Sequence, residues 1–272
     1  MAENKSALIS GAKTDFSERD PEFIRRMLPG LWLISTLYFR AEVTGMEKVP
    51  EGPVLFVGNH NGGSMPLDVP IFLLAFNTYF SVDRPLYALA HAMLTGAPGL
   101  GKLARRFGVL TAGPEAAREA FDQGASLLVY PGGDVEVMRP WSQRFEINFD
   151  GRKGFLKLAY ESGVPIVPVV TDGMHDSLIV LTDGKQLAKK LRLDKLGRIK
   201  VLPIALAAPF GITVGDLFHV PFPVKVRTNV LDPIDLNAKY GDDIDYDHAY
   251  DYVTSTMQVG LKKLATKRTL PI

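Results

Sequence analysis

The stretch that decides the fold is 54–68, which reads VLFVGNHNGGSMPLD. Its apolar start predicts a short buried strand, and the glycines that follow predict a tight turn. Asp68 then stands where a helix would begin. Strand, turn and helix in this order form one unit of an α/β fold, in which active sites lie at the carboxyl ends of the strands. The residues of this turn are therefore the first candidates for chemistry.

Outward from that unit, short β-rich runs alternate with helical patterns over most of the chain. The runs LLVY (127–130) and IVPVV (166–170) are apolar throughout, as strands covered on both faces are. For residues 41–272 we therefore predict an α/β fold with a mostly parallel central sheet covered by helices on both faces. Strands are expected at 41–44, 54–58, 86–89, 108–110, 126–130, 165–170 and 224–230, and helices at 68–76, 99–107, 114–123, 153–162 and 247–266.

Residues 1–40 are predicted to form an N-terminal appendage to this fold. After a polar tail, a helix capped by Asp20, with Pro21 at its first position, is expected. Two arginines precede an apolar run that includes Trp32, which is the pattern of a helix lying in a membrane interface. A helix packed into the core shows a similar amphipathic stripe, so both interpretations stand.

Composition excludes several functional classes. The 272 residues include 31 Lys and Arg against 30 Asp and Glu, and this balance argues against a nucleic-acid partner. The chain has no cysteine, which excludes disulfides, thiolate nucleophiles and cysteine-ligated zinc. Its five histidines show no metal-ligand spacing, and it has neither a serine-hydrolase elbow nor a phosphate-binding P-loop. We therefore expect no metal and no bound cofactor.

The mean hydropathy of +0.06 is high for a soluble protein, yet no stretch suits a bilayer-crossing helix. Such a helix needs about 20 consecutive apolar residues. The run at 27–39 is shorter, and the run at 201–224 is broken by four prolines. The N-terminus lacks the basic and apolar regions of a secretory signal. We predict a protein bound peripherally to the cytoplasmic face of a membrane.

His60 and Asp68 are the candidate catalytic pair in the first turn. Histidine changes its protonation near neutral pH and can take the proton of a hydroxyl group. An aspartate bonded to the other ring nitrogen would fix the tautomer and stabilise the imidazolium. Gly62 and Gly63 would let the backbone approach a ligand closely. The alternative is a histidine in a polar turn, with Asp68 as the cap of the next helix.

A second glycine turn follows the strand expected at 126–130 and reads PGGDVEVMR. Gly132 and Gly133 can offer backbone N–H groups to an oxyanion. Glu136 and Arg139 would then position a substrate. The alternative is an ordinary strand-to-helix turn with a solvated pair of charges.

These two turns and two later motifs resemble the phospholipid/glycerol acyltransferase family, which includes the lysophosphatidate acyltransferases. The first turn is similar to the family's first motif, Asn-His-x-x-x-x-Asp, and YPGG at 130–133 lies where the third motif reads Phe-Pro-Glu-Gly. GVPIVPV at 163–169 matches the family's Val-Pro-Ile-x-Pro strand, and GRKGF at 151–155 lies where a helix begins with Lys-x-Gly. The motifs occur in the family's order over residues 40–235.

The sequence departs from the family pattern in three respects. Seven residues separate His60 from Asp68 instead of four, so the loop at 62–66 must bulge for the two to meet. Gly132 replaces the acidic residue of the third motif, and the phosphate-binding arginine of the second motif has no clear counterpart. These losses indicate a less charged acceptor, and the Pro-Gly-Gly turn is similar to that of diacylglycerol and wax-ester acyltransferases.

The resemblance implies an O-acyltransferase that needs no bound cofactor. A fatty acyl group would move from acyl-CoA or an acyl-carrier protein to the hydroxyl group of a glycerolipid or other lipid alcohol. His60 would act as general base with support from Asp68, and the absence of cysteine favours direct transfer. Substrate contacts would come from Asn59, Gly62, Gly63, Gly132, Gly133, Glu136, Arg139 and Lys153.

Two other functions stay open. The chain could be a catalytically silent lipid-binding relative, because its first and third motifs depart from the pattern. It could also be a hydrolase of lipid esters or thioesters that uses the same His–Asp pair. The basic segment KQLAKKLRLDKLGRIK at 185–200 predicts either a contact with anionic headgroups or coenzyme A phosphates, or a solvated helix face. The sequence does not fix the acyl-chain length or the oligomeric state.

Overall fold

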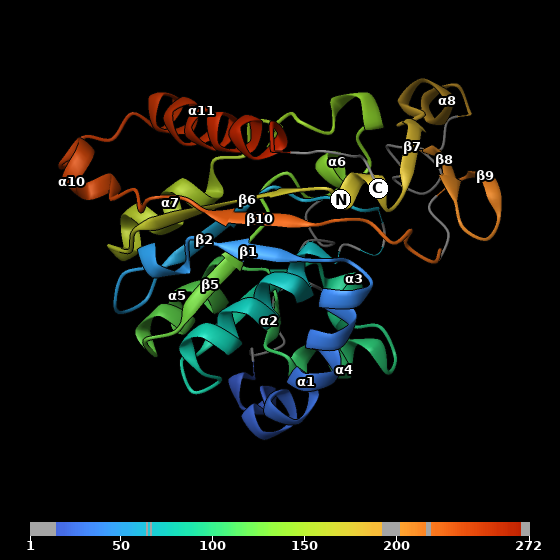
Figure 1. The fold of residues 1–272 in the computed structure, drawn as a ribbon. Helices are drawn as coiled ribbons and strands as arrows, with labels where there is room; N and C mark the ends of the chain where they lie inside the picture. The colour runs from blue at the N-terminus through green and yellow to red at the C-terminus, as the bar shows by residue number, and fades with distance from the viewer. Residues whose placement is uncertain (1–14, 64, 66, 192–201, 216–218, 268–272) are drawn as a thin grey trace, which may run out of the picture.

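The computed structural model describes residues 15–63, 65, 67–191, 202–215 and 219–267. Its main feature is a seven-stranded sheet in the order β1-β10-β6-β2-β5-β3-β4 (Figure 1). Neighbouring strands are parallel except β10 and β6, which run antiparallel. The strands are β1 (Glu42–Thr44), β2 (Leu55–Gly58), β3 (Leu86–Ala90), β4 (Val109–Thr111), β5 (Ser126–Val129), β6 (Ile166–Asp172) and β10 (Arg227–Val230).

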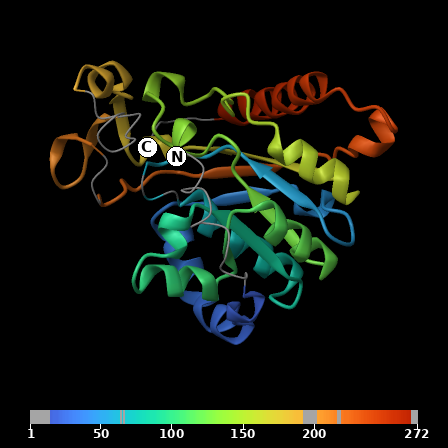
Figure 2. The ribbon, with the colours of Figure 1, turned by 180° about the vertical axis from the view of Figure 1, so that it is seen from behind.

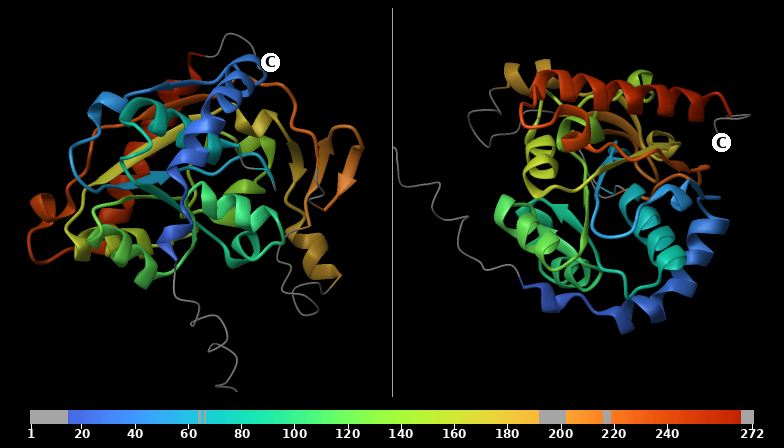
Figure 3. Two further views of the ribbon diagram at one scale, coloured as in Figure 1. Left: turned by 90° about the horizontal axis from the view of Figure 1, so that it is seen from below. Right: turned by 90° about the vertical axis from the view of Figure 1, so that its left-hand side faces the viewer.

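Helices cover both faces of this sheet. Figure 3 shows α11 and α1 on opposite sides of it. The helices are α1 (Pro21–Leu37), α2 (Asp68–Phe80), α3 (Ala92–Thr95), α4 (Leu100–Arg106), α5 (Pro114–Asp122), α6 (Gly133–Val137), α7 (Gly154–Ser162), α8 (Lys185–Lys190), α10 (Leu236–Tyr240) and α11 (Tyr246–Ala265). The predicted fold class, a mostly parallel sheet between helical layers, is confirmed.

Strand β2 shows why both faces are covered. Successive side chains of a strand point to opposite faces. Leu55 and Val57 join a core cluster with residues of α5, α7 and α11, whereas Phe56 packs against α2. The rings of Phe56 and Phe72 meet edge to face with centroids 5.0 Å apart. A strand that is apolar at every position therefore lies in the middle of the sheet, as β2 does.

Helix α1 packs against α2, in one of the two helical layers that cover the sheet. Its beginning follows the prediction, because Pro21 opens the helix and the Asp20 side chain accepts from the N–H of Phe23. Ile24 is buried, whereas Trp32 is 55% exposed. The helix thus combines a packed beginning with an exposed apolar second half. None of the helices formed by the described residues is both long and apolar enough to span a bilayer.

A second, three-stranded antiparallel sheet lies at one end of the molecule (Figures 1 and 2). It consists of β7 (Ile179–Thr182), β8 (Ile204–Ala207) and β9 (Gly211–Val214). The sequence did not predict this small sheet: the prolines in 201–224 excluded a long helix there but did not indicate strands. The basic segment forms α8 as far as Lys190, and residues 192–200 of it lie outside the described residues.

Candidate active site

His60 and Asp68 meet at the carboxyl end of β2, the middle strand of the large sheet. His60 follows the last residue of β2 by two positions, and Asp68 is the first residue of α2. Nδ1 of His60 lies 3.1 Å from Oδ2 of Asp68. The longer spacing is therefore compatible with the pair, although Ser64 and Pro66 of the intervening loop lie outside the described residues.

Asp68 is held in place by backbone donors. Its side chain is 0% exposed, whereas that of His60 is 15% exposed. Oδ2 of Asp68 accepts from the N–H of Asn61 (3.0 Å), and Oδ1 accepts from the N–H of Val69 (2.9 Å). A carboxylate in this position can only accept, so we assign the proton of neutral His60 to Nδ1 and leave Nε2 as its basic atom. The His60 ring also stacks on Tyr130, with centroids 4.4 Å apart.

Asn59 joins β2 to β6 beyond the last strand residue. Its Oδ1 accepts from the N–H of Thr171 (2.8 Å), and its Nδ2 donates to the carbonyl of the same residue (2.9 Å). The side chain is fully buried. Asn59 was predicted to contact substrate, but here its amide bonds to the neighbouring strand and fixes the start of the His60 turn.

Glu136 of α6 supports the same turn from the other side. Its Oε2 accepts from the backbone N–H of His60 (2.9 Å), and its Oε1 accepts from the N–H of Asn148 and from Nη1 of Arg139 (both 3.3 Å). Burial raises the pKa of Glu136 to about 6, against the opposing effect of the Arg139 charge. Glu136 and Arg139 are 0% and 5% exposed, so the alternative of a solvated pair is wrong.

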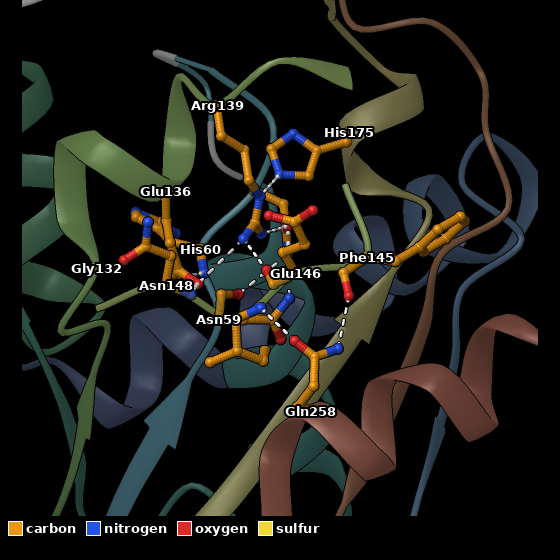
Figure 4. Close-up of polar contacts among 12 residues, drawn as sticks. Asn59, His60, Gly132, Glu136, Arg139, Phe145, Glu146, Asn148, His175 and Gln258 are labelled. Atoms are coloured by element: carbon orange, nitrogen blue, oxygen red, sulfur yellow. Dashed lines mark hydrogen bonds and ion pairs between the residues drawn. The ribbon is translucent and has the colours of Figure 1, made fainter. Parts of the chain in front are cut away.

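Arg139 connects three segments of the site (Figure 4). Its Nε donates to Nε2 of His175 (2.7 Å), its Nη2 donates to Oδ1 of Asn61 (2.9 Å), and its Nη1 donates to the carbonyl of Glu146. Burial, together with the charge of Arg139, holds the pKa of His175 well below its usual value. His175 is therefore a neutral acceptor that orients the guanidinium.

Gly132 leaves room for the Glu136 carboxylate. A Cβ added at Gly132 would overlap the end of the Glu136 side chain. The φ of Gly132 is −66°, an ordinary helical value, so the requirement for glycine is one of space. Position 132, which is acidic in the family's third motif, therefore has no side chain here. The carboxylate of Glu136, four residues later, lies beside it.

Arg152 fixes the carbonyl side of this second turn. Its Nη1 donates to the carbonyls of Pro131 (3.0 Å) and Gly132 (3.1 Å), and its Nη2 pairs with Asp134 (2.9 Å). The N–H of Gly133 donates to the carbonyl of Tyr130 at 3.1 Å. Because that N–H bonds within the turn, the remaining glycine N–H candidate for an oxyanion is that of Gly132.

Helix α11 holds the loop behind Arg139 and Glu136. Oε1 of Gln258 accepts from the N–H of Ile147 (2.9 Å), and its Nε2 donates to the carbonyl of Phe145 (2.7 Å) (Figure 4). The same loop supplies the Glu146 carbonyl and the Asn148 N–H described above. The support of the site therefore extends from β2 to the last helix of the chain.

Of the remaining predicted residues, Lys153 lies apart from this network, whereas Gly62 and Gly63 belong to the loop between His60 and Asp68. Lys153 pairs its ammonium group with Asp247 of α11 on the surface. Gly62 and Gly63 have positive φ values of 97° and 69°, as expected of a glycine turn. A Cβ at Gly63 would overlap Leu178, so this glycine packs against the segment that leads into β7.

Sequence reasoning missed Asn61, Tyr130 and His175. His175 carried a usable signal, because it follows the carboxyl end of β6 just as the two glycine turns follow β2 and β5. Asn61 and Tyr130 lie next to predicted residues but have no pattern of their own. Among the described residues, no three His, Asp or Glu side chains converge as metal ligands would.

Comparisons with known proteins identify similar sequences. The model of the family described as acyltransferase matches residues 40–172. An uncharacterized protein of Mycobacterium tuberculosis is 31% identical over 79% of this chain and 58% of its own length. A mouse protein described as a DGAT1/2-independent enzyme synthesizing storage lipids is 30% identical over 73% of this chain and 54% of its own. The chain therefore spans little more than half the length of these relatives.

A solved structure shares the fold. The crystal structure of the 1-acyl-sn-glycerophosphate acyltransferase PlsC from Thermotoga maritima aligns with a TM-score of 0.55. The alignment covers 93% of this chain and 86% of that one, at 19% sequence identity. At this identity the likeness concerns the arrangement of strands and helices.

Proposed function

We propose that the chain, whose residues 40–172 match the model of the family described as acyltransferase, is an O-acyltransferase that moves a fatty acyl group from a thioester to the hydroxyl group of a lipid alcohol. The observation that carries the proposal is the pair formed by the partly exposed His60 ring and the buried Asp68 carboxylate, 3.1 Å apart at the end of β2. This is the arrangement that a general base and its orienting group require.

The proposed reaction is a single displacement. Nε2 of His60 takes the proton of the lipid hydroxyl group, and the oxygen attacks the thioester carbonyl carbon. The carbon–sulfur bond then breaks, and the departing thiolate receives the proton from the imidazolium, which Asp68 stabilises in the meantime. The chain has no cysteine that could carry the acyl group. The N–H of Gly132 is our candidate donor to the oxyanion.

Glu136 and Arg139 serve this reaction as positioning residues. Both are buried and bonded to protein groups, and Glu136 accepts directly from the His60 N–H. Their geometry supports a role in fixing the His60 backbone, in place of the substrate contact expected from the sequence. A shift of the base by about 1 Å can cost two orders of magnitude in rate, so such support matters for catalysis.

The acceptor we propose is a neutral lipid alcohol such as a monoacyl- or diacylglycerol. The phosphate-binding arginine of the family's second motif has no clear counterpart in this chain, which supports an acceptor without a phosphate group. The mouse relative is described as synthesizing storage lipids, which supports the same class. The donor in this proposal is acyl-CoA or acyl-carrier protein, and the substrates lie at a membrane surface to which the protein binds peripherally.

The test is incubation with radiolabelled acyl-CoA or acyl-carrier protein and a panel of monoacylglycerol, diacylglycerol, lysophosphatidate and long-chain alcohol. We expect labelled ester from the neutral alcohols and less from lysophosphatidate. His60→Ala should lower the rate by roughly 10²–10⁴-fold, the usual contribution of a general base. His248→Ala, at an exposed histidine of α11, is the matched control and should keep the wild-type rate.

Two results would replace the proposal. Labelled free fatty acid without ester, lost in His60→Ala, would make the protein a hydrolase that uses the same pair. Lipid binding without either product would make it a silent relative. The closed His60–Asp68 pair favours an active enzyme over that last alternative.

A further inference from the structure

The small sheet has an outer face that is apolar at every strand position but one. In register, Leu206 pairs with Ile179 and Ile212, and Ile204 pairs with Thr182 and Val214. Ile212 is 72% exposed and Val214 is 57% exposed. An antiparallel sheet with one face on the core normally turns polar side chains to water on the other. This face therefore calls for an apolar neighbour.

The opposite face of the same sheet accounts for its folding. Val180, Ala205 and Ala207 are buried in a small cluster together with Leu178. The sheet is thus anchored by its inner side chains, and the outer ones are not needed to hold it. Since exposed apolar side chains of this kind are costly in water, their presence points to a partner.

Basic side chains border this apolar face. A surface hollow of about 490 Å³ is lined by Ile204 from the outer face and by Lys185 and Lys190 of α8. Asp183 lines it as well and pairs with Lys185 at 3.0 Å. Lys189 of the same helix is exposed. The border therefore carries a net positive charge next to apolar surface, which matches the anionic headgroups and acyl chains of a phospholipid layer.

Residues that flank the small sheet lie against the loop of the candidate active site. Gly63, in the loop between His60 and Asp68, approaches Leu178 and His219, which flank the small sheet in sequence. The chain that follows β9 also contacts α1: the Tyr38 hydroxyl group at the end of α1 donates to the carbonyl of Pro221 at 2.7 Å. The exposed apolar half of α1 is thus connected to the chain that leaves the small sheet.

We propose that the outer face of β7–β9, bordered by the lysines of α8, docks on a membrane containing anionic phospholipid and brings the partly exposed His60 ring close to the lipid that holds the acceptor. The role of this docking in catalysis rests on the proposed function, whereas the docking itself is inferred from the exposed apolar face and the lysine charges. Figure 3 shows the small sheet and α8 on one side of the molecule.

The apolar contribution is tested by Ile212→Glu/Val214→Glu, with Val259→Glu, at an exposed position of α11, as the matched control. Sedimentation with vesicles of phosphatidylcholine and phosphatidylserine gives the partition coefficient. We expect the double variant to partition at least about tenfold less and the control to match the wild type. Unchanged circular dichroism and thermal midpoint will show that the double variant is folded. Equal partitioning of double variant and wild type would overturn the proposal.

The charge contribution is tested by Lys189→Gln/Lys190→Gln, with Lys262→Gln/Lys263→Gln on α11 as the control. Each lysine near an anionic surface contributes about fivefold in binding, so the α8 pair should cost roughly 25-fold on vesicles with phosphatidylserine. On phosphatidylcholine alone the same variant should equal the wild type. An equal loss in the control pair would show that net charge, not this border, drives binding, and would overturn the assignment to α8.

Two readouts separate this inference from the proposed function. With a short-chain monoacylglycerol dissolved as monomer, the Ile212→Glu/Val214→Glu variant should acylate at the wild-type rate, whereas with acceptor in vesicles it should be at least about tenfold slower. His60→Ala should bind vesicles normally.

Vesicle binding without acylation by the wild type would refute the function and keep the docking. A wild-type dimer that the double variant dissociates, with no vesicle binding by either, would make the face a contact between copies and refute the docking.

Discussion

The two glycine turns of the large sheet look alike in sequence but differ in what they present. The turn after β2 places His60 at the surface of the site with its ring partly exposed, whereas the turn after β5 buries Glu136 and Arg139 almost completely. Both turns follow neighbouring parallel strands, and two hydrogen bonds join them, from the His60 N–H to Glu136 and from Arg139 to Oδ1 of Asn61. The comparison teaches that a charged residue after a glycine turn can serve the site without facing the substrate.

The difference follows from the size and burial of the groups. Glu136 has room for its carboxylate because residue 132 lacks a side chain, and its two oxygens are taken by three donors. The Asp68 carboxylate is equally buried, but its Oδ2 bonds to the His60 ring, which is partly exposed. We therefore assign the acid–base chemistry to the first turn and the positioning of His60 to the second turn, and the predictions below test that division.

The largest effect is expected within the first turn, from Asp68→Asn. Asparagine keeps the shape but cannot stabilise the imidazolium, and it favours the wrong tautomer of His60. The rate of acyl transfer should fall roughly 10²–10⁴-fold, because the same Asp→Asn change in a Ser-His-Asp triad costs about 10⁴-fold. Steady-state rates of ester formation measure it. A fall of less than about tenfold would show that Asp68 only caps α2, as the alternative has it.

Gly132→Ala should break the second turn. The added methyl group meets the Glu136 carboxylate, and overpacking of a buried site typically costs about 1–3 kcal/mol of the free energy of unfolding. Urea denaturation measures the loss. Gly154→Ala is the matched control, because the space around Gly154 is open and its φ is not positive. If both variants unfolded at the same urea concentration as the wild type, the inference that Glu136 packs against Gly132 would be wrong.

The buried carboxylate of Glu136 should make stability depend on pH. Its pKa is raised from 4.5 to about 6 in the folded protein, so folding favours the protonated form between these values. This contribution is fully present below pH 4.5 and is lost as the pH rises through about 6, a change of about 2 kcal/mol. The free energy of unfolding of the wild type, minus that of Glu136→Gln, should therefore fall by about that amount from pH 4 to pH 7. A difference that is constant, or that rises with pH, would contradict the buried, desolvated state of Glu136.

Lys153→Ala should have the smallest effect. Its ammonium group pairs with Asp247 on the surface, and exposed pairs contribute only about 0–1 kcal/mol to stability. Acyl transfer should stay within about twofold of the wild-type rate if the lysine contacts no substrate. A rise in the KM for the donor thioester with unchanged kcat would restore Lys153 to the substrate-binding role that its position in the motif suggested.

The sequence predicted the large sheet well because its signals are local. Apolar runs such as 127–130 and 166–170 show a strand covered on both faces, and glycine turns mark where such strands end. The small sheet escaped prediction because its strands are short, because β8 and β9 lie between prolines, and because its apolar outer face has no polar alternation to mark strands.

The site was predictable in its members more than in their roles. His60 and Asp68 could be paired because catalysis requires these two groups together, and the turns supplied Glu136 and Arg139. Burial could not be inferred, since it depends on His175 and on Gln258 of α11, more than thirty and one hundred residues further along the chain. Residues that act through long-range contacts carry no local pattern.

The division between the two turns is tested most directly by a double-mutant cycle of acyl-transfer rates with His60→Ala and Glu136→Gln. If Glu136 acts only by positioning His60, Glu136→Gln should lower the wild-type kcat by about tenfold and leave the residual rate of His60→Ala unchanged. If Glu136→Gln instead lowered the rate of His60→Ala by the same factor as that of the wild type, Glu136 would act on the substrate independently, and the assignment of support to the second turn would be wrong.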